Sequence, residues 1–460
     1  MKAPFDISGD LNTPVSAYLK LAPFRPRFLL ESVEGGERLG RYSFIGFGDA
    51  LDLRIDRQGL RLDGRRLPAP ANGQELLAVL RAALAAAPKP QPAAAGVPLA
   101  GGLVGYAGYD VVRMFERLPA QRAPAATPLL HYVAPASLLV FDHVTRGIAL
   151  LHGGPEAERA ALKREVTQAL QGGVRPRAGS GWFERPRPGL DRGRFLDAVR
   201  RAREHIAAGD IYQLVLSICF EGRHALDPFQ VYRALRAVNP SPYLYYCALD
   251  EVTVIGSSPE ALVRLNAGIA ELRPIAGTRP RADTEERDLE LEVELRADEK
   301  ENAEHVMLVD LARNDLGRVA ESGSVRVAPY RSIERYSHVM HLVSGVAGRL
   351  ASGRDAFDLF AAAFPAGTLV GAPKVRAMQI LDELEPAGRG LYGGTVGYFG
   401  LRGDMDQAIT IRTLVFQDDR YSYQAGAGIV SDSDPGAEHA EILSKGAAML
   451  RALELAESGL

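Results

Sequence analysis

The first 172 residues alternate between short runs with the two-residue period of strands and longer runs with helical spacing. Leu51, Leu53 and Ile55 alternate with polar residues, and the turn residues after them predict a hairpin over 51–67. Further strands are expected at 28–30, 42–47, 136–144 and 147–152, and helices at 74–86 and 156–170. This mixture predicts an α+β unit that ends near residue 172.

A stretch rich in proline, glycine and arginine, residues 173–192, predicts a linker, and the pattern changes after it. Helices are expected at 191–208, 227–238, 290–316, 355–364 and 374–384, and from residue 435 toward the C-terminus. Strands are expected at 211–220, 243–249, 253–255, 261–265, 271–275, 396–401, 408–416 and 421–424. The sequence therefore predicts two domains, 1–172 and 193–460, and a large sheet in the second.

Composition narrows the class of protein. A length of 460 residues and a hydrophobic fraction of 47% are enough for an extensive core, and a formal net charge of −3 gives no basic footprint for nucleic acid. No segment suits a signal peptide or a membrane span, so we expect a cytoplasmic protein with small-molecule or protein partners. Cys219 and Cys247 lie in apolar strand-like runs, which favours buried thiols over zinc ligands or a disulfide.

The segment from Gly426 to Lys445 carries the densest set of candidate site residues. Its first residues, Gly426, Ala427 and Gly428, follow a predicted strand directly. We expect them to form a loop whose bare backbone N–H groups approach an anionic ligand.

The same segment continues into a predicted helix. Asp434 suits the N-cap and Pro435 the first helical position. Glu438, Glu441 and Lys445 then follow at spacings of three and four residues, which places them on one helix face. This face suits a metal-bound carboxylate substrate, and an ordinary solvated ion pair between Glu441 and Lys445 accounts for the same pattern.

A second group of carboxylates lies on the predicted helix near residue 300. Asp298 and Glu301 match a capping box, whereas Glu304, one turn further on, has no such structural explanation. Together with Glu438 and Glu441, it could supply the hard oxygen ligands that Mg²⁺ prefers. A solvated helix face explains Glu304 equally well.

Two further motifs combine glycine with polar groups. Gly277 and Thr278 are expected at a strand end, between arginines, where an N–H and an O–H can receive a carboxylate. Glu260 follows a tight turn and precedes an apolar run, so partial burial could raise its pKa for general-acid work. Both motifs are also compatible with an ordinary exposed turn.

The ordered motifs of this chain resemble those of the chorismate-utilising enzymes, and most closely those of anthranilate synthase large subunits. The match is dense over 190–450 and reaches the first part of the chain. The motifs are LLES (29–32), IYQLVLS (211–217), NPSPYL (239–244), GSSPE (256–260), RPIAGTRPR (273–281), DEKENAEHVMLVDLARNDLGR (298–318), YSHVMHLVS (336–344), FPAGTLVGAPK (364–374), RGLYGGTVGY (389–398), AITIRT (408–413) and GAGIVSDSDP (426–435).

The resemblance implies an α/β (α+β) fold with antiparallel sheets, helices packed outside them and two intertwined domains, of which residues 193–460 bind chorismate. It assigns Mg²⁺ to Glu304 and Glu441, with Glu438 adjacent, and places the ring carboxylate of chorismate on that metal. Three carboxylates would repel an anionic substrate unless a divalent cation reversed the local charge.

The resemblance also implies roles for the remaining site residues. Glu260 would protonate the departing ring hydroxyl, and Gln213 stands where water-using relatives carry a lysine base. The enolpyruvyl carboxylate would be held by Arg412, Tyr392 and the backbone of Gly426, Ala427 and Gly428, and the other end of the substrate by Gly277 and Thr278. His341 and Thr368 would complete the pocket, and Lys445 would pair with the ligand carboxylates or the substrate.

The implied reaction joins chorismate and ammonia. Ammonia adds at C2 as the C4 hydroxyl leaves, which gives aminodeoxyisochorismate, and loss of the C2 proton and of pyruvate then gives anthranilate, the first step of tryptophan biosynthesis. His341 is a candidate participant in the second step. A glutamine amidotransferase subunit is the expected partner, in a hetero-oligomer, because neither cysteine has the flanks of a glutaminase nucleophile.

Three other functions are alternatives to anthranilate synthesis. Aminodeoxychorismate synthases often carry a lysine nucleophile in the motif where this chain has Ala276, although some members carry alanine. Isochorismate and salicylate synthases are disfavoured by Gln213. A ligand-sensing module without catalysis is disfavoured because every proposed acid, metal ligand and substrate clamp is present.

Feedback inhibition by tryptophan is a further implication of the resemblance. The inhibitor site would lie between the domains, where a carboxylate and a hydroxyl suit an ammonium and where Pro and Tyr suit an indole. Its residues would be Glu31 and Ser32 from the first domain and Asn239, Pro240, Ser241, Pro242, Tyr243 and Leu244 from the second. Leu244 departs from the methionine of many tryptophan-sensitive members.

Overall fold

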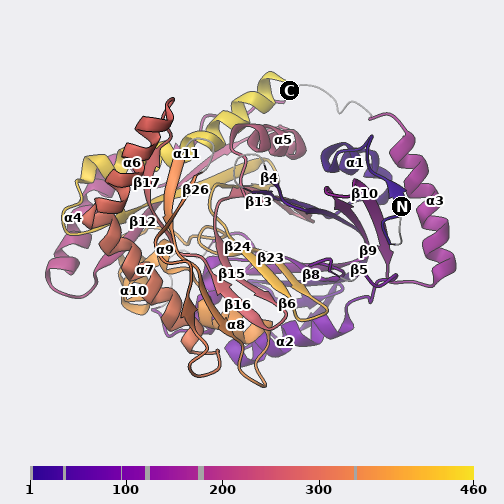
Figure 1. Ribbon diagram of the computed structural model, residues 1–460, viewed down its shortest axis with the longest axis horizontal. Coiled ribbons are helices and arrows are strands. Elements are labelled where there is room, and N and C mark those ends of the chain that lie inside the picture. The colour runs from indigo at the N-terminus through magenta and orange to yellow at the C-terminus, as the bar shows by residue number, and fades with distance from the viewer. Residues whose placement is uncertain are drawn as a thin grey trace.

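The structure is a computed structural model that describes residues 4–34, 38–94, 96–119, 125–174, 181–335 and 339–459. Antiparallel strands form the interior, and helices surround them (Figure 1). The predicted class, antiparallel sheets with helices packed outside, is confirmed. Residues 175–180 of the predicted linker lie outside the described residues.

The helices begin and end mostly where the sequence places them. Several start at a side-chain cap, as at Asp191, Asp227 and Asp434. Their bounds are α1 Pro14–Lys20, α2 Gly73–Ala86, α3 Glu156–Gln171, α4 Arg192–Ala207, α5 Pro228–Val238, α6 Glu285–Ala297, α7 Glu299–Gly317, α8 Ala356–Ala363, α9 Gly367–Val370, α10 Lys374–Leu384 and α11 Pro435–Ser458.

One large sheet runs through both parts of the chain. From the first part it takes β1 Ile7–Ser8, β2 Phe28–Glu31, β5 Tyr42–Asp56, β6 Gly59–Leu62, β7 Arg65–Leu67, β8 Gly102–Ala107, β9 Leu130–Asp142 and β10 Gly147–His152. From the second part it takes β11 Arg187–Pro188, β12 Gln213–Arg223, β13 Tyr243–Leu249, β14 Val252–Ser258, β15 Ala261–Asn266, β16 Ile269–Leu272, β18 Arg326–Val327, β21 Val346–Arg349, β22 Gly371–Ala372, β23 Thr395–Gly400, β24 Met405–Ile409, β25 Thr413–Gln417 and β26 Arg420–Ile429.

Two ladders join the parts. β2 pairs with β13, with Glu31 opposite Leu244, and β8 pairs with β23, with Gly105 opposite Gly397. Both parts therefore share hydrogen-bonded strands as well as a continuous hydrophobic core.

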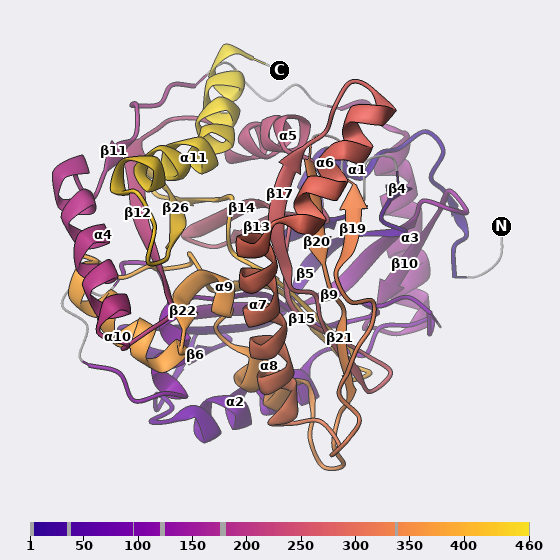
Figure 2. The same ribbon diagram turned by 60° about the vertical axis from the view of Figure 1, so that its left-hand side comes forward.

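Two small sheets lie beside the large one. β3 Val33–Glu34 pairs with β4 Arg38–Leu39, and β20 Val339–Val343 lies between β17 Ile275–Pro280 and β19 Ser332–Arg335. Figure 2 shows α6 and α7 along β17 at the front of the molecule. A separate small cluster that includes Leu291, Leu295 and Met340 packs α6 onto this sheet.

Among the predicted elements that were wrong in extent, two bear on the site. The helix expected at 290–316 is divided at Asp298, which ends α6 and caps α7 by accepting from the Glu301 N–H at 3.0 Å. The strand expected at 408–416 is interrupted by residues 410–412, where Arg412 has a φ of 48°. That left-handed backbone cannot continue a strand.

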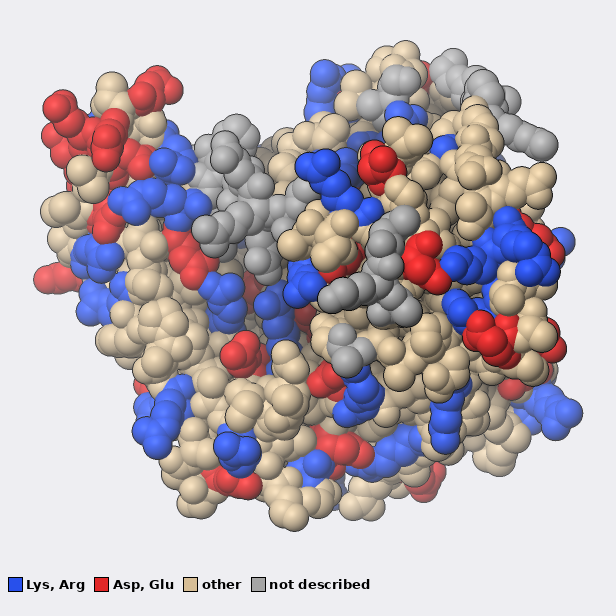
Figure 3. Space-filling view, turned by 45° about the vertical axis from the view of Figure 1, so that its right-hand side comes forward, with Lys and Arg blue, Asp and Glu red and all other residues tan. Residues whose placement is uncertain are grey.

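Basic and acidic side chains are interspersed on the face seen in Figure 3, without a continuous basic patch there. In the described part of the chain, no helix combines the length and apolar character needed to cross a bilayer.

Candidate active site

A cavity of about 420 Å³ opens between α7, α9, α11 and the strands β12 and β26. That volume suits a small-molecule ligand. The predicted site residues that line it are Gln213, Glu260, Thr278, Glu304, Thr368, Tyr392, Arg412, Gly426, Gly428, Glu438, Glu441 and Lys445.

Helix α7 supplies one wall. Lys300, Glu304 and Leu308 follow at four-residue spacing, so one helix face enters the cavity. The Gln213 side chain, from β12, donates from Nε2 to Glu304 Oε1 at 3.2 Å. A Cβ added to Gly428 would lie 2.9 Å from the same Nε2, so the absence of a side chain there leaves room for the amide.

Helix α11 supplies the facing wall. Its N-cap, Asp434, accepts from the Ala437 N–H at 2.8 Å, as the sequence predicts. Lys445 Nζ lies 2.6 Å from Glu441 Oε1 and donates to the Gly426 carbonyl at 3.1 Å. Burial raises the pKa of Glu438, and the negative charge of Glu441 adds to that effect, while a hydrogen bond from Ser433 opposes it.

The three predicted metal ligands share this cavity, but they are not drawn into a tight cluster. Among the described residues, the group whose ligand atoms lie within 4.8 Å of one another is Asp52, His131 and Asp250. Arg27 Nη2 lies 3.1 Å from both Asp52 Oδ2 and Asp250 Oδ1, so a guanidinium already balances that second group.

The donor chemistry at Glu304, Glu438 and Glu441 fits Mg²⁺, because all three offer hard carboxylate oxygens and, among the residues that the structure describes, no thiol or imidazole lines the cavity with them. Wide spacing is compatible with that ion, which usually keeps several waters or substrate oxygens in its coordination shell.

Glu260 lies at the opposite side of the cavity, between β14 and β15. The Thr368 hydroxyl, on α9, donates to Glu260 Oε1 at 3.1 Å. Burial raises the pKa of Glu260 to about 7, although the Thr368 hydrogen bond and the charge of Lys445 both lower it. Near neutral pH this carboxyl is therefore protonated in a substantial fraction of molecules, as general-acid chemistry requires.

Arg412 provides positive charge to the same cavity. Its left-handed backbone ends the connection after β24, and its guanidinium donates from Nη1 to Asn239 Oδ1 at 3.5 Å. Burial lowers the pKa of Arg412. A half-buried cation with such a long contact suits an anionic ligand.

The residues Gly426, Ala427 and Gly428 form part of strand β26, paired with β12, and the loop predicted there was wrong. Gly426 and Gly428 face the cavity, whereas Ala427 is fully buried in the core on the other side of the strand. A Cβ added to Gly426 would lie 2.4 Å from the Tyr392 hydroxyl oxygen, so glycine leaves room for that ring.

Gly277 and Thr278 lie within β17, where the sequence predicts a strand end. A β-bulge occurs at this point, and Gly277 has a φ of 69°. Thr278 lines the cavity, whereas Gly277 and His341 do not. The His341 ring contacts both, with Nδ1 3.0 Å from the Gly277 carbonyl oxygen and 3.1 Å from Thr278 Oγ1, and burial lowers the pKa of His341.

Some of the residues predicted for a tryptophan site line a common cavity, and others do not. A separate cavity of about 220 Å³ at the junction of β2 and β13 is lined by Glu31, Ser32, Pro242, Tyr243 and Leu244. Asn239, Pro240 and Ser241 do not line it.

The carboxylate of Glu31 is already engaged in that junction. It accepts from the Tyr232 hydroxyl and from Arg236 Nε, the latter at 3.1 Å. Both partners come from α5, so Glu31 is held toward that helix.

Several cavity residues were not predicted from the sequence. Lys300 and Leu308 lie one helical turn before and after Glu304, and Met449 follows Lys445 by one turn, so helical spacing could have identified all three. Leu369 lies next to Thr368 on the short helix α9. The others depend on strand register or loop course, which spacing does not reveal, and they are Val215, Ile275, Ile411, Gln424, Ala425, Val430 and Ser433.

The site thus combines a neutral-pH acid, Glu260, with a carboxylate-rich wall and three cations, Lys300, Arg412 and Lys445. This arrangement suits a small anionic substrate whose leaving group must be protonated.

Comparisons with known proteins agree with this chemistry. Residues 25–451 match the model of the chorismate binding enzyme family. The chain is 46% identical over 459 residues to anthranilate synthase component 1 of Thermus thermophilus, and the match covers 98% of this chain and 97% of that protein.

Solved structures give the same relationship. The crystal structure of anthranilate synthase component I from Streptococcus pneumoniae matches with a TM-score of 0.77 and 35% identity, over 98% of this chain and 100% of that one. The menaquinone-specific isochorismate synthase MenF of Escherichia coli shares the fold, with a TM-score of 0.71 and 20% identity over 95% of this chain and 91% of that one. The chain therefore belongs to the chorismate-binding enzyme family.

Proposed function

We propose that this chain is component 1 of an anthranilate synthase, which converts chorismate and ammonia to anthranilate, pyruvate and water. The observation that carries the proposal is the position of Glu260, a half-buried acid with a pKa of about 7, in a cavity that also holds the carboxylate wall and Arg412. Relatives of that name with 46% and 35% identity, each matched over nearly its full length, support it.

Arg412 and Tyr392 would hold the enolpyruvyl carboxylate of chorismate. Both line the cavity beside Gly426, and Arg412 supplies the positive charge. Thr278 would contact the other end of the substrate through its hydroxyl, which His341 orients from behind.

Glu304, Glu438 and Glu441 would hold Mg²⁺, and the bound ion would offset their negative charge and attract the ring carboxylate. The Gln213 amide orients the Glu304 carboxylate by its hydrogen bond. Because an amide does not take a proton from water, this residue suits ammonia as the nucleophile.

Glu260 would protonate the C4 hydroxyl, which leaves as water while ammonia forms the new bond at C2. The added nitrogen then loses its extra proton, and the product is aminodeoxyisochorismate. Loss of the C2 proton makes the ring aromatic as the C–O bond to the enolpyruvyl group breaks, and that group accepts a proton and leaves as pyruvate.

Amination at C4, as in aminodeoxychorismate synthase, is the alternative that the sequence leaves open. Ala276 in β17 is 9% exposed and pairs with Leu342, so its position offers no nucleophile. Product identification after incubation with chorismate, Mg²⁺ and ammonium separates the two. Anthranilate supports the proposal, and 4-amino-4-deoxychorismate or isochorismate would overturn it.

We expect the isolated chain to use ammonium and not glutamine. Cys219 and Cys247 lie on strands, and burial raises the pKa of each thiol to about 12, so neither forms a reactive thiolate near neutral pH. Anthranilate formation should therefore appear with ammonium chloride, and glutamine should give less than about 1% of that rate unless an amidotransferase subunit is added.

Variants Cys219→Ser and Cys247→Ser serve as controls. If glutamine supported turnover by the chain alone and either variant removed it, the prediction would be wrong and one thiol would be a glutaminase nucleophile.

Tryptophan would bind the 220 Å³ cavity at the β2–β13 junction and inhibit the enzyme. Asn239 lies just before the segment that lines this cavity, and its Oδ1 lies 3.5 Å from Arg412 Nη1 in the active site. Inhibition requires tryptophan to bind an inactive arrangement more tightly than the active one, and this contact offers a short physical connection.

We expect Ser32→Leu to raise the tryptophan concentration for half-inhibition by at least about tenfold, because the larger side chain fills the indole space. Chorismate KM and kcat without tryptophan should stay within about twofold of wild type, since Ser32 does not line the catalytic cavity. Wild-type activity that stays flat up to saturating tryptophan would refute the assignment.

A further inference from the structure

A buried ion pair lies directly behind the catalytic cavity. Glu385 ends α10, and Arg389 follows it by four residues, with 7% and 2% of their side chains exposed. The pair is bidentate: Arg389 Nη2 lies 2.7 Å from Glu385 Oε1, and Nε lies 2.8 Å from Oε2. Neither residue has a role in the reaction described above.

The remaining donors of Arg389 reach two walls of the cavity. Nη1 donates to the Leu369 carbonyl at 2.6 Å, and Nη2 donates to the Val215 carbonyl at 2.7 Å. Leu369 belongs to α9, next to the Thr368 that contacts Glu260, and Val215 belongs to β12. One guanidinium therefore links the acid side of the cavity to the β12 side.

Glu385 makes a second connection. Its Oε1 accepts from the Ser217 backbone N–H at 3.0 Å and from the Ser217 hydroxyl at 2.6 Å. The Gln424 side chain in turn donates to Ser217 Oγ at 2.8 Å. Gln424 lines the cavity, so the network continues to its surface.

Tyr392 forms part of the wall that this network reaches. A second cavity of about 520 Å³ lies on the other side of the wall, and Tyr392 and Gln424 line both cavities. The Tyr392 ring packs in the large hydrophobic cluster, and the ion pair adds a polar contact on top of that packing. The Arg389 guanidinium carbon lies 5.5 Å from the centre of the Tyr392 ring, within cation–π range.

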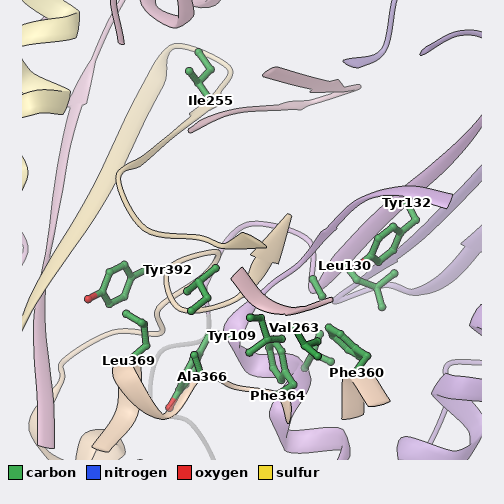
Figure 4. Close-up of a cluster of buried hydrophobic side chains, with 14 of the residues drawn as sticks. Tyr109, Leu130, Tyr132, Ile255, Val263, Phe360, Phe364, Ala366, Leu369 and Tyr392 are labelled. Atoms are coloured by element: carbon green, nitrogen blue, oxygen red, sulfur yellow. The ribbon is translucent and has the colours of Figure 1, made fainter. Parts of the chain in front are cut away.

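Figure 4 shows Tyr392 and Leu369 at the same end of the buried cluster. Arg389 also lies over the ring of Tyr109, at 4.9 Å, so it is held between two aromatic rings. The guanidinium therefore has a defined place from which to fix Tyr392.

We propose that the Arg389–Glu385 pair is a positioning element that holds Tyr392 and the adjoining wall in the geometry that receives the substrate carboxylate. This inference rests on the proposed function for the identity of the substrate. A buried ion pair often adds little stability compared with apolar residues of similar size, so its value here lies in fixed geometry.

A double-mutant cycle between Glu385→Gln and Tyr392→Phe tests the inference. We expect each single change to lower kcat/KM for chorismate by about tenfold, and the double variant to lose little more than Glu385→Gln alone. That loss of additivity is the expected result, because a Tyr392 hydroxyl that is no longer held in place has less to contribute. Independent costs that multiply would overturn the inference.

The matched control is Asp382→Asn. Asp382 lies one turn before Glu385 along α10 and pairs with Arg113 Nη2 at 2.5 Å, outside the catalytic cavity. It should leave kcat/KM within about twofold of wild type and show additive behaviour with Tyr392→Phe. An equal coupling in this control would also overturn the inference, since it would indicate a general effect of weakening α10.

A milder variant covers the case in which Glu385→Gln does not fold. Ser217→Ala removes one hydrogen bond to Glu385 from a residue that does not line the catalytic cavity. Its cycle with Tyr392→Phe should show the same sign of coupling, and additivity there would overturn the inference.

Calorimetric titration with chorismate and Mg²⁺ distinguishes failure of this inference from failure of the proposed function. If the wild-type chain binds chorismate without forming anthranilate, the proposed activity is overturned. The double-mutant cycle is then measured on the dissociation constants for chorismate, and additive effects on binding would again overturn the inference. A chain that neither binds nor converts chorismate would overturn both.

Discussion

Replacing Glu260 with Gln is expected to lower kcat by about 10²–10⁴-fold, because the amide keeps the shape of the side chain but has no acidic proton for the departing hydroxyl. Thr368 would still reach the amide oxygen, so the cavity should keep its shape. Chorismate KM should therefore change little, which assigns the loss to the chemical step. Steady-state rates with saturating Mg²⁺ and ammonium measure it.

The pH dependence gives an independent check. If Glu260 is the general acid, its protonated form is the active one. Because burial raises its pKa to about 7, kcat/KM should then fall as the pH rises through 7. Free ammonia must be held constant across the series, because at a fixed total ammonium concentration the free base increases as the pH rises and would mask the expected fall. The fall in kcat/KM near pH 7 should be absent in Glu260→Gln. It should remain in the control Glu271→Gln, which alters an exposed carboxylate on the neighbouring β16.

Stability should also fall as the pH rises. A pKa raised from its ordinary value of 4.5 to about 7 means that protonated Glu260 favours the folded state, and this stabilisation is lost as the pH rises through 7. Glu260→Gln should therefore melt at a higher temperature than wild type at pH 8, and at a similar temperature at pH 4.

The kinetic result decides the role of Glu260. If the variant kept more than about a tenth of wild-type kcat, Glu260 would not be the acid.

The sequence predicted the order of most helices and strands because each carries its own periodicity and capping. Asp434 and Pro435 begin α11 as expected, and the hairpin after Leu51 forms in β5, β6 and β7. It did not predict the break after β24, because residues 408–416 alternate like one continuous strand. The left-handed backbone of Arg412 arises only when the chain turns to bring that side chain into the cavity.

The helical half of the site follows from spacing, whereas the strand half does not. Glu438, Glu441 and Lys445 share a cavity face because positions three and four residues apart always lie together on a helix. Ala427 turns away between two glycines that face the cavity, because successive residues of a strand point to opposite sides. Recognition of the motif alone could not separate these neighbours.

Long-range partners were also invisible in the sequence. Glu31 was expected to be available for a ligand ammonium, but α5, some 200 positions later, brings Tyr232 and Arg236 to its carboxylate. Its part in a tryptophan site would therefore be to hold Arg236 and the β2 backbone in place. Pro242, Tyr243 and Leu244 line the cavity directly.

The second large effect concerns the carboxylate wall: Glu304→Gln and Glu441→Gln should each lower activity by at least about a hundredfold, because each would remove a hard anionic ligand from the proposed Mg²⁺ site. The two changes have different local effects. In Glu304→Gln the new amide oxygen can still accept the hydrogen bond from Gln213, so that contact is largely kept. In contrast, Glu441→Gln removes the negative charge that pairs with Lys445 at 2.6 Å.

Because of this difference, the two variants can distinguish loss of Mg²⁺ binding from displacement of Lys445. If Mg²⁺ is the reason for the loss, both variants should require a higher Mg²⁺ concentration for half-maximal activity, and both should bind Mg²⁺ more weakly in calorimetry. If the loss came from a displaced Lys445 instead, Glu441→Gln would be inactive with unchanged Mg²⁺ affinity.

Glu301→Gln is the matched control, because Glu301 lies on the same helix three residues before Glu304, does not line the cavity and contacts Arg279 Nη1 at 3.4 Å. It should leave Mg²⁺ dependence unchanged. Glu304 and Glu441 come from different helices that both line the cavity, so a shared rise in the Mg²⁺ requirement would indicate that one ion bridges α7 and α11. Near-normal turnover with unaltered Mg²⁺ dependence in either variant would exclude that residue as a ligand.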